Sequence, residues 1–134
     1  MINIIIMAHG DLAECMLKTA QGISGVDASG VYTFSAACQN DCSLICRRIE
    51  KIFNESPDGA LVLSDMFGGS GANVPLQAAK CRQGVNIITG LNLSMLMAAL
   101  QYRASMNADE LADKVEAEGK RAVINAAKFL RGGK

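Results

Sequence analysis

The feature that most constrains the fold of this chain is an alternation of short apolar runs with longer segments of helical periodicity. Residues 2–8 form the first run, which is rich in isoleucine and ends at a His-Gly-Asp sequence. Such a run is typical of a buried strand that gives way to a turn. Residues 60–63 are wholly apolar, as a central strand of a parallel sheet is expected to be. Residues 30–34 and 85–89 predict two further strands.

Helices are predicted between and after these strands. They cover residues 11–24, 41–54, about 73–82, 92–102 and 107 to about 130. Asp11 followed by Glu14 predicts a capping box at the start of the first helix. In the first helix, Leu12, Met16, Ala20 and Ile23 recur at spacings of four, four and three, which predicts one apolar face.

The order of these elements predicts the fold class. Strands that alternate with helices pair in parallel and carry helices on both faces of the sheet. We therefore expect a single doubly wound α/β domain over residues 1–134, with a mainly parallel central sheet. The 134 residues suit one domain, and half of them are hydrophobic. The polar tail, residues 131–134, is expected to be flexible.

Composition and charge narrow the class of protein. Lysine plus arginine equals aspartate plus glutamate, at 13 each, and no basic stripe with interleaved aromatic residues is present. Nucleic acid is therefore not expected as a partner. Met1 leads straight into the first strand without a basic leader, and no apolar stretch is long enough to cross a bilayer. We expect a cytoplasmic location.

The cysteines do not predict a metal site. They are odd in number, contain no Cys-x-x-Cys pair, and comprise Cys15, Cys38, Cys42, Cys46 and Cys81. With one histidine in the chain and no second cysteine cluster, a zinc site lacks its ligands. We interpret the cysteines as buried thiols, and we expect neither a metal nor an organic cofactor.

His9 is the only histidine, and it stands where the first strand ends. In open α/β sheets the carboxyl ends of strands are where functional groups gather. Imidazole has two distinct ring nitrogens, one of which can act as a nucleophile, so it suits proton or phosphoryl transfer. The alternative is a structural histidine that caps the end of a strand.

A second polar segment, residues 64–73, directly follows the third predicted strand. If the first and third strands are neighbours, His9 and Asp65 emerge side by side at the carboxyl edge of the sheet. A carboxylate next to an imidazole fixes its tautomer and leaves the other nitrogen as the nucleophile. The alternative is that Asp65 merely caps a turn.

The same segment contains Gly68, Gly69 and Ser70, which precede the third predicted helix. Backbone N–H groups in a glycine turn at a helix N-terminus stabilise a phosphate, because glycine lets the backbone approach the anion closely. No lysine follows, so the segment is not a P-loop. We expect Gly10, Gly68, Gly69 and Ser70 to bind phosphate, although two glycines after a strand can also form an ordinary tight turn.

Three segments resemble the enzyme IIA components of the mannose family of the bacterial sugar phosphotransferase system. They are Ala8-His9-Gly10 with Leu12-Ala13-Glu14, Asp65-Met66-Phe67-Gly68-Gly69-Ser70 with Asn73, and Gly90-Leu91-Asn92-Leu93 with Met95-Leu96. The resemblance covers nearly the whole chain in the same order. It implies a phosphotransferase component with a phosphohistidine intermediate, in one mannose-type IIA domain.

The resemblance also implies partners and roles. His9 would accept a phosphoryl group from the phosphocarrier HPr and pass it to a IIB component for sugar uptake, with Asp65 as the imidazole partner and Ser70 at the phosphate. It implies a homodimer that meets the membrane only through a permease complex. Two alternatives remain: a regulatory IIA that signals its phosphorylation state to other proteins, and an interaction domain without the chemistry. Met66 and Phe67 are candidates for partner docking or for the core.

Overall fold

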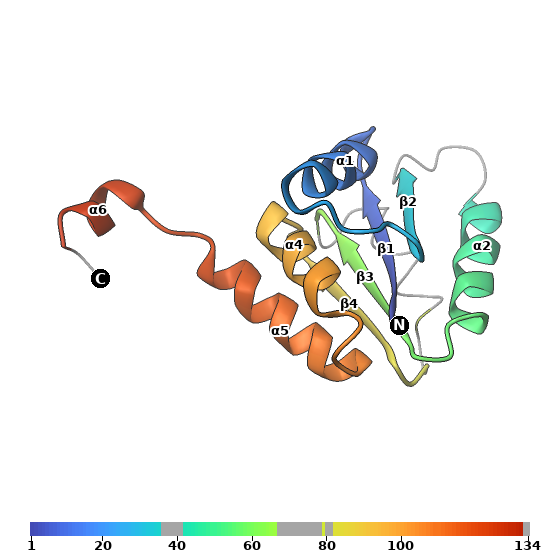
Figure 1. Cartoon of the computed structure of the whole chain (residues 1–134). Coiled ribbons are helices and arrows are strands. Elements are labelled where there is room, and N and C mark those ends of the chain that lie inside the picture. Colours follow the sequence, from blue (N-terminus) through green and yellow to red (C-terminus); the bar gives the residue numbers. More distant parts are fainter. Residues whose placement is uncertain (36–41, 67–78, 80–81, 133–134) are drawn as a thin grey trace.

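Four parallel strands form one sheet in this computed structural model, which describes residues 1–35, 42–66, 79 and 82–132. The strands are β1 (Asn3–Ala8), β2 (Val31–Ser35), β3 (Ala60–Ser64) and β4 (Val85–Thr89). Their order is β2-β1-β3-β4, with every pairing parallel (Figure 1). The predicted doubly wound α/β fold is therefore confirmed, and the first and third strands are indeed neighbours.

Helices cover both faces of this sheet. One face carries α1 (Leu12–Ser24), α4 (Leu93–Tyr102) and α5 (Ala108–Arg121), and the other carries α2 (Cys42–Asn54) (Figure 1). The helix predicted over residues 73–82 lies almost wholly outside the described residues. No helix in the described part of the chain is both long and apolar enough to span a membrane.

The two faces of the sheet have separate cores, because successive side chains of a strand point to opposite faces. Ile4 and Ile6 of β1 pack among α1, α4 and α5. Ile5 and Met7 pack with α2 on the other face. All four side chains are buried, which explains why the central strand is a continuous apolar run rather than an alternating one.

Of two expectations for the first helix, one is wrong and the other is met in part. Asp11 precedes α1 but makes no side-chain capping hydrogen bond, since its φ of −101° and ψ of 15° differ from the extended backbone of a capping residue. Of the four residues expected on the apolar face of α1, Ala20 is buried and Met16 packs against the core, whereas Leu12 and Ile23 are exposed. Ala13, which was not expected there, is buried instead, because a small side chain lets the helix lie close to its neighbours.

The last predicted helix is also interrupted. Residues 107–130 form α5, which ends at Arg121, and a separate short helix, α6 (Ala126–Leu130), which lies away from the body of the molecule (Figure 1). Val123 and Ile124 lie between these two helices, and their β-branched side chains disfavour helix there. Asn125 then starts a new helix, because its side chain accepts a hydrogen bond from the Lys128 N–H at 3.1 Å.

The turn before β3 requires glycine at position 59. Gly59 has a φ of +95°, and a Cβ there would lie 2.4 Å from the Gly84 carbonyl oxygen and 2.8 Å from Ala108 Cβ. We expect Gly59→Ala to lower the free energy of unfolding by about 3 kcal/mol, from backbone strain and overpacking together. Chemical denaturation measures this, with Gly25→Ala as the control, because Gly25 has a φ of +67° but open space around it. The control should lose only about 1 kcal/mol; equal losses would contradict the steric argument.

Candidate functional site

The sheet register places the ends of β1 and β3 beside each other. Met7 aligns with Ser64 in this parallel pair, and the Asp65 N–H donates to the Met7 carbonyl at 3.3 Å. His9 directly follows the end of β1 and Asp65 directly follows the end of β3, so the two residues leave the sheet side by side. After β1 the chain runs to β2 on one side, while β3 lies on the other, so the two residues stand at the switch point of the sheet. Such points form the binding crevices of open α/β folds.

His9 and Asp65 are in direct contact. Asp65 Oδ2 lies 2.8 Å from His9 Nδ1 and also accepts the His9 backbone N–H at 2.9 Å. Asp65 Oδ1 accepts the Met66 N–H at 2.9 Å. Three interactions thus fix one carboxylate. Because two of them come from His9, the position of the Asp65 carboxylate is fixed with respect to both the imidazole ring and the backbone of His9.

The contact determines which nitrogen of the imidazole carries a proton. A carboxylate only accepts hydrogen bonds, so Nδ1 of His9 is the protonated nitrogen and Nε2 is left for other chemistry. Burial alone would raise the pKa of Asp65. The hydrogen bonds from the backbone and ring of His9, the charge of that ring and the Met66 N–H outweigh it, and they hold the pKa below the usual value for aspartate. Asp65 is therefore an anion at neutral pH.

The two side chains differ in their exposure. His9 is 49% exposed and Asp65 is 13% exposed. The imidazole is thus accessible from solvent, while its carboxylate partner is shielded. Met66, the next residue after Asp65, is 60% exposed and lies beside the pair. An imidazole presented in this way can meet a group carried by another macromolecule as well as one on a small molecule.

The predicted phosphate-binding residues are only partly described. Gly10 follows His9 with a φ of +60°, which turns the chain toward α1. It borders a hollow whose lining residues include Asp11 and Glu14. These negative charges disfavour an anion inside that hollow. Gly68, Gly69 and Ser70, together with Phe67, lie outside the described residues.

The expectation that the cysteines are buried is wrong for Cys15 and only partly met by Cys46. Cys15 is exposed, because it lies on the face of α1 away from Ala13 and Ala20. Cys46 is half-buried on α2, where burial and the neighbouring Glu50 carboxylate raise the pKa of its thiol. In the described residues no histidine, cysteine, aspartate or glutamate cluster is suited to a metal.

Sequence reasoning missed two features around the pair. One is the set of backbone N–H groups of His9 and Met66 that hold Asp65, which no sequence pattern encodes. The other is the burial of Ser64, the residue before Asp65, whose carbonyl accepts the Leu91 N–H at 2.9 Å. The available signal was a hydroxyl at the end of an otherwise apolar strand.

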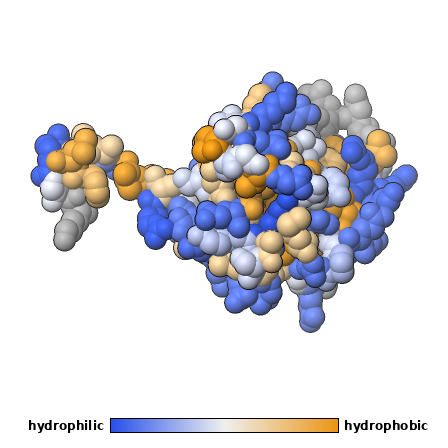
Figure 2. Space-filling view, in the orientation of Figure 1, coloured by the Kyte–Doolittle hydropathy of each residue, from blue (hydrophilic) through white to orange (hydrophobic). Residues whose placement is uncertain are grey.

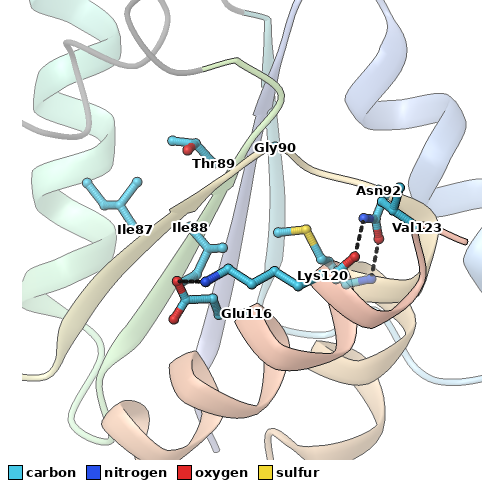
Figure 3. A pocket seen from close by; sticks show the side chains of 10 residues that line it. Ile87, Ile88, Thr89, Gly90, Asn92, Glu116, Lys120 and Val123 are labelled. Atoms are coloured by element: carbon cyan, nitrogen blue, oxygen red, sulfur yellow. Dashed lines mark hydrogen bonds and ion pairs between the residues drawn. The ribbon is translucent and has the colours of Figure 1, made fainter. Parts of the chain in front are cut away.

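A separate groove lies between β4 and α5, and neither His9 nor Asp65 lines it (Figure 3). Its apolar lining includes Ile88 and Met95. Its polar rim contains Lys120, paired with Glu116 at 3.3 Å. Asn92 donates to the Gly119 carbonyl at 3.2 Å and so joins α5 to the start of α4 (Figure 3). Its two charged side chains, Glu116 and Lys120, are paired with each other, and Asn92 is occupied in joining the two helices.

The fold and the site together define a class: an open parallel α/β domain with an imidazole–carboxylate pair at its switch point. A family model described as PTS system fructose IIA component matches residues 3–116. The chain therefore belongs to the IIA components of the sugar phosphotransferase system, as the resemblance of its motifs implied.

Individual relatives agree with this family. The PTS system mannose-specific EIIAB component of Escherichia coli K12 is 29% identical over 103 residues, which are 76% of this chain and 32% of that protein. The chain thus spans about a third of the length of that relative.

Solved structures extend the likeness to the whole fold. The phosphotransferase system component EIIA from Streptococcus agalactiae superposes with a TM-score of 0.85 and 27% identity, over 96% of this chain and 99% of that one. The mannose/sorbose specific IIA subunit from Enterococcus faecalis gives 0.75 and 29%, over 92% and 93%.

Proposed function

We propose that this chain is a phosphoryl carrier, which accepts a phosphoryl group on His9 from phospho-HPr and passes it to a IIB component for sugar uptake. The observation that carries the proposal is the 2.8 Å contact between Asp65 and Nδ1 of His9. It sets the exposed imidazole in the tautomer whose Nε2 has a free lone pair. Membership in the IIA family supports the same role.

The proposed step is an in-line displacement at phosphorus. The Nε2 lone pair of His9 forms a new N–P bond while the N–P bond of the donor phosphohistidine breaks, and the donor imidazole keeps that electron pair. The Nδ1 proton stays in place, and the Asp65 carboxylate stabilises the positive charge that develops on the ring. Because histidine is both donor and acceptor, the transfer is reversible. Positioning and charge stabilisation do the catalytic work.

The phosphoryl oxygens need donors of their own. We assign them to backbone N–H groups of Gly10, Gly68 and Gly69 and to the hydroxyl of Ser70. The hollow beside Gly10 is lined in part by Asp11 and Glu14, so the phosphoryl group in this proposal is held by the Gly10 backbone N–H outside that hollow. The exposed Met66 side chain then borders the surface that the protein donor would contact.

The test is incubation with enzyme I, HPr and labelled phosphoenolpyruvate. We expect an acid-labile label on this chain that depends on HPr and that peptide mapping places on His9. Transfer of this label to a IIB protein supports the transport role. A labelled chain that donates to no IIB partner supports the regulatory alternative, and an unlabelled chain refutes the carrier function in both forms.

We also propose that the carrier is a homodimer joined through its C-terminal arm, defined here as residues 122–132. Four large apolar side chains of the arm are exposed, with Val123 at 80% and Leu130 at 82%; the other two are Ile124 and Phe129. The arm extends from the body and presents this apolar surface to solvent (Figures 1 and 2). Val123 also borders the apolar groove beside β4 (Figure 3), so the arm begins at the edge of this groove.

Replacing the four apolar side chains of the arm with serine should weaken the dimer by at least about a hundredfold, since each buried side chain of this size contributes ~1.5 kcal/mol or more. Light scattering across a concentration series measures the dissociation constant. Ile23→Ser is the matched control, because Ile23 is also exposed but lies on α1. A full-length chain that is monomeric at all concentrations would refute the dimer.

A further inference from the structure

Ser64 is an unusual residue in its setting. It ends β3, whose other residues are alanine, leucine, valine and leucine, and only 1% of its surface is exposed. In the described part of the chain, Arg103 is the one other buried residue that is polar or charged. Burying a hydroxyl carries a desolvation cost unless a hydrogen bond compensates for it.

The hydroxyl bridges the residue that precedes the site and the residue that follows it. Ser64 Oγ donates to the Met66 carbonyl at 3.4 Å, across the intervening Asp65. The Met66 N–H donates to Asp65 Oδ1 at 2.9 Å. Both polar groups of the Met66 backbone are thus held next to Asp65, which restricts the turn from which the carboxylate projects.

Ser64 is itself held by the strands on either side of β3. It pairs with Met7 on β1 and with Thr89 on β4, and its carbonyl accepts the Leu91 N–H. A hydroxyl attached at such a rigid point can fix a neighbouring loop, whereas a hydroxyl on a loop residue would move with it. The strand end is therefore a fixed reference for the Asp65 turn.

We propose that Ser64 is a positioning residue for the site: by holding the Met66 carbonyl, its buried hydroxyl keeps the Asp65 carboxylate on Nδ1 of His9. Ser64 touches neither the imidazole nor the reacting atoms. It acts through Asp65, and its effect is on the tautomer of His9. The kinetic consequence rests on the proposed carrier function, whereas the tautomer consequence does not.

Because His9 is the only histidine, long-range ¹H–¹⁵N spectra report its tautomer without ambiguity. We expect the wild type to hold Nδ1–H almost wholly. Ser64→Ala should raise the Nε2–H population by about three- to fivefold: one net hydrogen bond supplies about fivefold, and the 3.4 Å distance from Ser64 Oγ to the Met66 carbonyl oxygen is long for such a bond. It should lower the rate of phosphoryl acceptance by a similar factor without changing the KM for phospho-HPr. Ser64→Thr, which keeps the hydroxyl, should stay within about twofold of the wild type.

Ser105→Ala is the matched control, because the Ser105 hydroxyl also donates to a nearby backbone carbonyl, that of Tyr102 at 3.2 Å, but at an exposed position after α4. It should change neither the tautomer nor the rate. If Ser64→Ala does not fold, Ser64→Cys provides the same comparison, since a thiol is a similar size but a weaker donor.

The outcomes separate this inference from the carrier function. An unchanged tautomer in folded Ser64→Ala overturns the positioning role, even if the rate falls, because the loss then arises elsewhere. If Ser64→Ala shifts the tautomer of His9 but neither the variant nor the wild type accepts a phosphoryl group, the positioning role is upheld and the carrier function is refuted.

Discussion

Substitution of His9 by glutamine is expected to abolish acid-labile phosphorylation by enzyme I, HPr and phosphoenolpyruvate, a reduction of at least about a thousandfold. The nucleophile of the proposed step is Nε2 of this ring, and an amide nitrogen has no comparable lone pair. Glutamine is a polar side chain of similar length at a position that is half exposed. The fold should therefore be unchanged, and circular dichroism and the melting temperature check this.

A second variant tests whether any exposed histidine would serve. Gln101 is an exposed residue of α4. The double variant His9→Gln with Gln101→His carries one histidine, as the wild type does, but away from Asp65. It should accept no label. Label on the double variant would indicate nonspecific phosphorylation, and label on the single variant would show that His9 is not the acceptor.

Substitution of Asp65 by asparagine is expected to slow phosphoryl acceptance by about a hundredfold, the lower range of effects seen for groups that assist proton and charge transfer. Asparagine is the same size, but it removes the negative charge that stabilises the phosphorylated ring. Its amide can also donate to Nδ1, which selects the wrong tautomer. Rapid-quench measurements of label incorporation give the rate.

Asp109→Asn is the matched control for this substitution. Asp109 also accepts a side-chain hydrogen bond, from Asn86 Nδ2 at 3.0 Å, but it lies in the first turn of α5. Its rate should stay within about twofold of the wild type. If Asp65→Asn reacts as fast as this control, Asp65 has only a structural role in capping its turn.

The sheet was predictable from the sequence because each strand is short, apolar and bounded by turn residues. Residues 85–89 form β4 as predicted. The strands β1 and β3 each differ from the prediction by one residue at one end, and β2 is shifted by one residue. The meeting of His9 with Asp65 followed from one further step, the adjacency of the first and third strands. That step rests on how parallel sheets are connected, so it needed no knowledge of side-chain geometry.

The details of helices and contacts were less predictable because they depend on tertiary packing. Ala13 and Ala20 bury their side chains in preference to Leu12 and Ile23, since the fit between surfaces outweighs hydrophobicity there. The helix break at Val123 to Asn125 is a competition between local preferences that periodicity does not measure. The proposed role of the Ser64 hydroxyl depends on its hydrogen bond to the Met66 carbonyl, which forms only in the folded chain.

The contact between His9 and Asp65 joins residues that are 56 positions apart in the chain. No local segment contains both groups, and a partly ordered chain with its helices formed but β3 undocked would have the residues without the pair. During refolding, the rate at which the native tautomer of His9 is recovered would therefore report the docking of β3 on β1. Circular dichroism would report the formation of the helices separately. The ring of His9, which is proposed to carry the phosphoryl group, would thus also report when the sheet assembles.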